Sequence, residues 1–123
     1  MESPSPGRPG APFVRPAVAW FVLAIAGLLE VVWAYAMKLS DGFTRLVPSL
    51  VTGAAMIASF ALLSWSMRVL PLGTAYTVWT GIGALGAFAV GVIGLGEPAN
   101  ALRLVAAALI LAGLVLMKLA TPG

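Results

Sequence analysis

The sequence predicts an all-α membrane protein that crosses the bilayer as four transmembrane helices. Of its 123 residues, 61% are hydrophobic and only 9% are charged, whereas a typical soluble domain has about 25% charged residues. Four apolar runs are each long enough for a helical span, which needs about 20 apolar residues. Open sheets cannot cross lipid and membrane barrels show period-two alternation, so these continuous runs indicate helices.

The first 16 residues are polar and include five prolines and two glycines. This composition favours neither a helix nor a packed core, so residues 1–16 are predicted to form a disordered tail. The transmembrane domain is then residues 17–120. Its helices are expected at about 17–37, 47–67, 70–95 and 102–119.

The first run carries one charge, Glu30, and is followed by a polar connection at residues 38–45. A cleaved signal peptide is the alternative for this run. Its apolar length exceeds the roughly 7–15 residues of a signal-peptide core, and such a core lacks a glutamate, so a span is favoured. The second run opens with Pro48, which a first helical turn tolerates.

The third run begins next to Pro71 and is rich in glycine. It ends at residues 96–100, a Gly-Glu-Pro-Ala-Asn segment typical of a turn. The fourth run carries Lys118 near its end and is followed by Thr-Pro-Gly. Each predicted span therefore has a recognisable boundary.

The charged residues exclude several classes of function. The net charge is +3, but the basic residues lie singly at span ends without a basic cluster, so no nucleic-acid partner is predicted. The chain has no cysteine and no histidine, which excludes thiolate or imidazole metal sites and the usual nucleophile–base pairs. We therefore expect no metal, no cofactor and no enzymatic activity.

The orientation in the membrane is not fixed by the basic residues. Orientation follows an excess of Lys and Arg on the cytoplasmic side. Here one side of the membrane has four such residues and the other side has three. The sequence is thus compatible with insertion in both orientations, the alternative being that the tail arginines select one. The two sets are Arg8, Arg15, Arg68 and Lys118 against Lys38, Arg45 and Arg103.

Glu30 is the candidate functional residue, because a charge inside a spanning helix costs about 2.5–3.5 kcal/mol and usually marks an ion or proton pathway. A carboxylate there can hold a proton or a cation but not both, which is the minimal chemistry of an antiporter. Gly27 and Trp33 share its helical face. Gly27 is expected to leave space, and Trp33 to offer a π face. The alternative is a glutamate that serves only helix assembly.

The second and third runs offer further candidates. Ser59 lies mid-span on a face shared with Thr52 and Ser66 and could hydrogen-bond the carboxylate or a ligand, or simply pack between helices. Tyr76 and Trp79 form a stripe at helical spacing with Thr80 and Gly83, for which an interfacial aromatic belt is the alternative. Gly81 and Gly83 suggest a flexible point in the helix.

The fourth run has no ionisable residue between Arg103 and Lys118. Ala106 and Gly113 stand seven residues apart and give it a smooth face suited to helix–helix contact. This helix is therefore predicted to serve assembly.

Three segments resemble the small multidrug resistance family, and the resemblance extends over residues 20–119. Residues 26–34 (Ala-Gly-Leu-Leu-Glu-Val-Val-Trp-Ala) are similar to its first helix, and Lys38 with residues 42–49 to the loop that follows. Residues 73–83 (Gly-Thr-Ala-Tyr-Thr-Val-Trp-Thr-Gly-Ile-Gly) are similar to its third helix.

The resemblance implies a proton-coupled exporter in the inner (plasma) membrane that works as an antiparallel, dual-topology homodimer. It assigns Glu30 to the shared proton and substrate site, Tyr76 and Trp79 to the pocket wall, and Ser59 to support of the glutamate. It also implies that Gly81 and Gly83 form the conformational hinge and that the fourth helix holds the dimer.

Trp33 and Lys118 resemble the guanidinium-exporting branch, whereas the broad multidrug branch has a small residue in place of the tryptophan. The chemistry agrees, because a carboxylate can bind planar guanidinium through two hydrogen bonds. Two alternatives stay open. One is an exporter of bulkier quaternary ammonium compounds, and the other is a membrane subunit that transports nothing.

Overall fold

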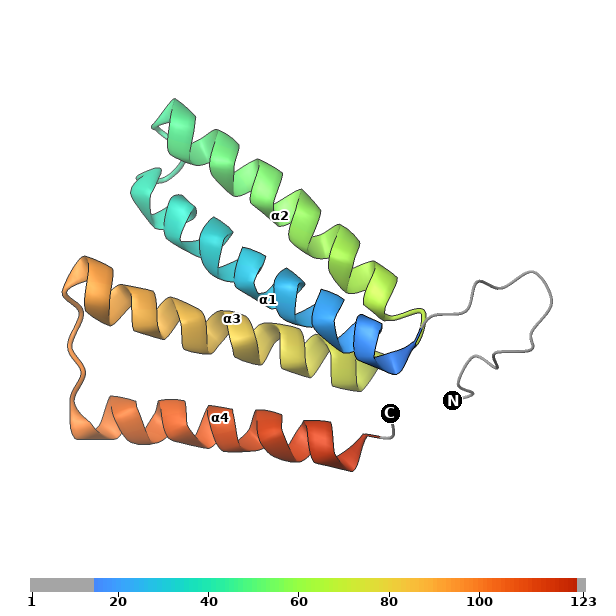
Figure 1. Ribbon diagram of the computed structural model, residues 1–123. Coiled ribbons are helices and arrows are strands. Elements are labelled where there is room, and N and C mark those ends of the chain that lie inside the picture. Colours follow the sequence, from blue (N-terminus) through green and yellow to red (C-terminus); the bar gives the residue numbers. More distant parts are fainter. Residues whose placement is uncertain (1–14, 122–123) are drawn as a thin grey trace.

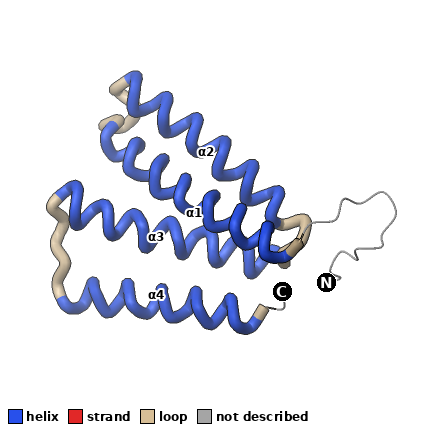
Figure 2. The backbone as a smooth tube through the Cα atoms, in the orientation of Figure 1, coloured by secondary structure: helices blue, strands red, loops and turns tan. Residues whose placement is uncertain are grey.

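The computed structural model describes residues 15–121, which fold into four α-helices (Figures 1 and 2). All four are long and apolar enough to cross a membrane. This confirms the predicted all-helical fold with four membrane-spanning helices. Of the predicted tail, all but the last two residues lie outside the described range. The helices are α1 (Pro16–Leu39), α2 (Leu46–Ser66), α3 (Leu72–Leu95) and α4 (Ala101–Ala120).

Local chemistry explains where the helices begin and end. Pro16 starts α1 because a first helical position needs no backbone N–H donor. Helix α3 begins at Leu72, two residues later than predicted, because the residue before a proline is disfavoured in the helical region. It ends at Leu95, because the next residue, Gly96, has a φ of 70°, the left-handed conformation that glycine adopts easily. The Asn100 side chain caps α4 by accepting from the Arg103 backbone N–H.

The helices form one layered bundle in which consecutive helices run in opposite directions (Figure 1). Helix α1 packs against both α2 and α3, and α4 packs against α3. No residue of α4 is buried by the rest of the described chain. The fourth helix is therefore an outer element, attached to a body made by the first three.

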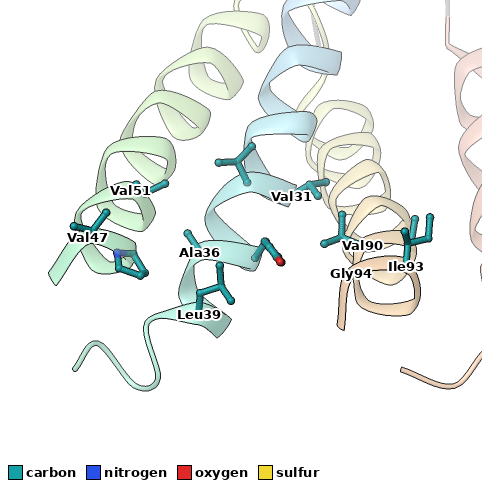
Figure 3. A pocket seen from close by; sticks show the side chains of 12 residues that line it. Val31, Ala36, Leu39, Val47, Val51, Val90, Ile93 and Gly94 are labelled. Atoms are coloured by element: carbon teal, nitrogen blue, oxygen red, sulfur yellow. The ribbon is translucent and has the colours of Figure 1, made fainter. Parts of the chain in front are cut away.

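The buried core lies at the end of the bundle where α1 and α3 begin and α2 ends. Leu23, Leu63 and Trp79 meet there, with at most 8% of each residue exposed. At the opposite end the three helices leave an apolar crevice of about 670 Å³ (Figure 3). Its lining comes from the last half of α1, the start of α2 and the last turns of α3, and includes Val31, Ala36, Leu39, Val47, Val51, Val90 and Ile93. The bundle is thus closed at one end and open at the other.

The small polar residues of α2 are buried together on one face of the helix, as their spacing of seven predicts. Thr52, Ser59 and Ser66 are each exposed by 1% or less. The Thr52 hydroxyl donates to the Pro48 carbonyl of its own helix, and Ser66 likewise donates to Leu63. Of these three residues, only Ser59 forms hydrogen bonds to other helices.

The connection between α1 and α2 has an unusual backbone. Asp41, Gly42 and Phe43 all have positive φ, at 51°, 72° and 65°. Ser40 is fully buried beside them, and its hydroxyl donates to the Met37 carbonyl while accepting from the Phe43 backbone N–H. A left-handed non-glycine residue costs about 1–2 kcal/mol, so these hydrogen bonds stabilise a conformation that two of the three residues disfavour.

Candidate functional site

The Glu30 carboxyl lies between α1 and α3 in the middle of the bundle. The Glu30 residue is partly exposed, but its Oε1 atom is covered and has no hydrogen-bond partner within residues 15–121. The carboxyl lies directly against the backbone of Gly83. A Cβ atom built at Gly83 would come within 2.8 Å of Glu30 Cγ and would overlap the carboxyl. The absence of a side chain at Gly83 is therefore what makes room for the carboxyl.

Gly27 has a different neighbour from the one expected. A Cβ atom at Gly27 would lie 2.8 Å from the Cβ of Ile82 on α3. Gly27 thus permits α1 and α3 to approach closely at this point, and the space beside the carboxyl comes from α3 instead. Gly27 packs against Ile82 and Gly83 against the Glu30 carboxyl itself, so both glycines permit the close approach of α1 and α3 at this site.

Ser59 joins three helices through its hydroxyl group. It donates a hydrogen bond of 2.7 Å to the Ala26 carbonyl on α1 and accepts one of 2.9 Å from the Trp79 indole N–H on α3. The sequence left open whether Ser59 bonds to the carboxylate, bonds to a ligand or packs between helices. Here it bonds to α1 one turn before Glu30, so it fixes the backbone that carries the glutamate and the orientation of Trp79.

Four aromatic rings from three helices form a continuous row next to this site. The Trp33 ring lies 6.4 Å from Phe60, Phe60 lies 5.6 Å from Trp79, and Trp79 lies 5.6 Å from Tyr76, measured between centroids. The interplanar angles of 70°, 59° and 52° are tilted or edge-on, as aromatic pairs prefer. The predicted stripe of Tyr76 and Trp79 therefore continues through Phe60 on α2 to Trp33 on α1.

Phe60 is the residue that the sequence did not reveal. It bridges Trp33 and Trp79, but in the sequence it is one apolar residue within an apolar helix. No local signal in the sequence marks it, because adjacent helical residues such as Ser59 and Phe60 point about 100° apart and do not share a face.

The members of the row differ in exposure. Trp79 is buried, at 6% exposed, whereas Tyr76 is 53% and Phe60 46% exposed. The Trp33 indole N–H is covered and has no acceptor within residues 15–121. The site therefore combines a carboxyl oxygen that has no partner within residues 15–121 with aromatic rings that are partly exposed. Such an arrangement can bind a small cation that carries N–H donors.

The remaining predicted residues lie outside this cluster. Gly81 faces α4, where an added Cβ would come within 2.9 Å of Leu114 Cγ, and α3 continues through Gly81 and Gly83 as one helix. Ala106 and Gly113 on α4 are exposed, and an added Cβ at Gly113 would meet no described atom within 4 Å. The hinge and assembly roles of these residues remain predictions.

Comparison with known proteins assigns a family. The model of the small multidrug resistance protein family matches residues 18–110. The chain is 60% identical over 104 residues to the guanidinium exporter of Citrobacter freundii, which covers 85% of this chain and 99% of that protein. The guanidinium exporter of Salmonella typhimurium is equally similar, and that of Escherichia coli K12 is 57% identical over the same length. The chain therefore belongs to the small multidrug resistance protein family.

Proposed function

We propose that the protein is a proton-coupled exporter of guanidinium in the inner (plasma) membrane, and that Glu30 exchanges protons for the cation. The observation that carries this proposal is the covered Oε1 of Glu30, which has no hydrogen-bond partner within residues 15–121 and stands three residues before Trp33 of the aromatic row. The similarity to guanidinium exporters along most of the chain supports the choice of substrate.

Two features of the chemistry support the proposed binding and coupling. Guanidinium is planar and carries N–H donors around its edge, so one carboxylate can accept two parallel hydrogen bonds from it. Trp33 lies three residues from Glu30 on the same helix and supplies a π face for the cation. A protonated carboxyl lacks the charge that holds the cation, so binding of one ligand releases the other.

We further propose that two copies form an antiparallel dimer with the fourth helix in the interface. The balanced basic residues permit both orientations. The exposed face of α4 at Ala106 and Gly113 and the exposed rings of Tyr76 and Phe60 are surfaces that a second copy can cover. Gly81 and Gly83 would then provide the bending point as access alternates between the two sides.

Transport by the purified protein in proteoliposomes tests the proposed function. With an imposed pH gradient, guanidinium should be taken up and should move protons in the opposite direction, while tetraethylammonium should be transported poorly. Equal or preferred transport of tetraethylammonium would favour a multidrug exporter. Proteoliposomes that transport neither cation would favour the non-transporting membrane subunit.

The proposed dual orientation predicts the labelling of a C-terminal cysteine. The natural chain has no cysteine, so one added at the C-terminus is the only target for a membrane-impermeant maleimide. Applied from one side of intact cells, the reagent should modify about half of the protein, because the two orientations are expected in similar amounts. Modification of nearly all or almost none would establish a single orientation and leave an antiparallel homodimer unsupported.

Trp33→Gly should change selectivity toward larger cations. Loss of the indole removes a π contact worth roughly 0.5–2 kcal/mol and enlarges the space near Glu30. Guanidinium binding should weaken by about tenfold (about 1.4 kcal/mol), since the carboxylate contact survives, while a tetra-alkylammonium should bind relatively better. Competition binding gives the ratio of the two affinities. Trp65→Gly, which introduces the same helix-weakening glycine outside the aromatic row, serves as the control. An unchanged ratio in Trp33→Gly would show that Trp33 does not border the cation.

A further inference from the structure

A charged groove lies at the end of the bundle where α1 and α3 end and α4 begins. It encloses about 370 Å³, and its polar side chains are Tyr35, Lys38, Glu97 and Arg103. The rest of its lining is apolar or small and comes mainly from α3. The groove shares no residue with the Glu30 site or the aromatic row.

An apolar groove of about 240 Å³ adjoins it between α3 and α4. The two grooves share Ala84, Phe88 and Arg103. Arg103 is the one charged residue that lines this second groove, which otherwise consists of Ala, Leu, Phe and Ile side chains. A polar compartment and an apolar compartment are therefore continuous, with a guanidinium group at their boundary.

The structure holds the Arg103 side chain at this boundary through two contacts. Its Nη2 lies 3.6 Å from Glu97 Oε1, and its guanidinium carbon lies 5.3 Å from the centroid of the Phe88 ring. Glu97 is held in turn, because its backbone N–H donates to the Gly91 carbonyl and its carboxyl packs against Gly91. The ion pair is about 40% exposed on each side, so Arg103 can also bond to an incoming anion.

Lys38 supplies a second cation on the other wall of the groove. Within residues 15–121, no carboxylate lies within 4.0 Å of its ammonium group. Lys38 and Arg103 against Glu97 leave the groove with a net charge of +1 (two cations minus one anion). An anion is thus the ligand that complements the polar compartment.

The position of the groove at the ends of the helices indicates which anion it binds. Lys38 belongs to the last turn of α1 and Arg103 to the first turn of α4, which places both at the level of lipid headgroups. We propose that this groove binds an anionic phospholipid, with its phosphate between Lys38 and Arg103 and an acyl chain along the apolar groove between α3 and α4. The acyl chain would then lie at the edge of the proposed dimer contact on α4, where the groove and that contact share Ala106. Basic pockets between spanning helices bind anionic lipid headgroups in this way.

Native mass spectrometry of the full-length, delipidated protein in detergent tests the proposal. Titration with phosphatidylglycerol and with phosphatidylcholine of identical acyl chains gives two apparent affinities per chain. Phosphatidylglycerol should bind at least about fivefold more tightly, since a basic residue near the headgroups contributes that much. Millimolar inorganic phosphate should not displace it. Equal affinity for the two lipids, or displacement by inorganic phosphate, would overturn the proposal.

Three variants assign the effect to this groove. Lys38→Gln should weaken phosphatidylglycerol binding by about fivefold, and Glu97→Gln should strengthen it by a similar factor. These opposite signs cannot both arise from misfolding. Arg45→Gln removes a basic residue at the same end of the bundle but outside the groove, and it should leave the affinity unchanged. If Arg45→Gln lowered the affinity for phosphatidylglycerol as much as Lys38→Gln does, general surface charge would explain the binding, and a specific site would be contradicted.

Discussion

Glu30→Gln should reduce pH-driven guanidinium uptake to the level of liposomes without protein. Glutamine has nearly the same size as glutamate and keeps a hydrogen-bonding group beside Gly83, so the helices should pack as before. Glutamine carries no negative charge and cannot release a proton. The residue at position 30 can then no longer exchange a proton for the cation. Uptake in proteoliposomes measures the loss, and size-exclusion chromatography checks that the protein remains folded and assembled.

Asp41→Asn is the matched control for this charge loss. Asp41 is an exposed carboxylate in the α1–α2 connection, and asparagine tolerates its positive φ at least as well as aspartate does. This variant should transport guanidinium at the wild-type rate. Full pH-driven uptake by Glu30→Gln would contradict the mechanism, because coupling would then have to occur at another group.

Gly83→Ala should lower the affinity for guanidinium by about tenfold or more (about 1.4 kcal/mol). The added methyl group would occupy the space that the Glu30 carboxyl now fills. The far end of a glutamate side chain can move away without unfolding the bundle, so the carboxyl is displaced and the fold is retained. Isothermal titration with guanidinium measures the affinity directly.

A control and a second readout separate this effect from others. Gly53→Ala makes the same change in α2, where the new methyl group meets no described atom within 4 Å, and it should bind guanidinium as wild type does. If Gly83 acts only as a hinge, Gly83→Ala should slow transport while leaving the affinity unchanged. An unchanged affinity would therefore refute the hypothesis that Gly83 positions the carboxyl, and the hypothesis that it acts as a hinge would remain.

The number and nature of the helices follow from local features of the sequence. Apolar length determines the spans, and Pro16 and Gly96 mark helix boundaries through backbone geometry that depends on one residue. The start of α3 was misplaced because Leu70 is apolar and buried without being helical. Hydropathy reports burial or lipid contact, and it does not distinguish a helical residue from a buried connection.

The site was only partly predictable for a related reason. The chemical types that matter, a lone acid and a set of aromatic rings, are visible in the sequence at Glu30, Trp33 and Trp79. Which atoms meet depends on how helices cross, and that depends on small residues such as Gly27 and Gly83 at contact points. The bond from Ser59 to the Ala26 carbonyl and the bridging position of Phe60 arise from this crossing.

The left-handed connection at residues 41–43 has a mechanical consequence. Besides its hydroxyl bonds, Ser40 accepts at its backbone carbonyl from Thr44 and Arg45, so the whole link is cross-braced by hydrogen bonds. A link of this kind resists changes in the angle between α1 and α2, so the two helices should move together as one rigid body. A rearrangement that opens one end of the bundle and closes the other must then change the backbone at other, more flexible positions. The glycine-rich middle of α3 is one place where such a change can occur.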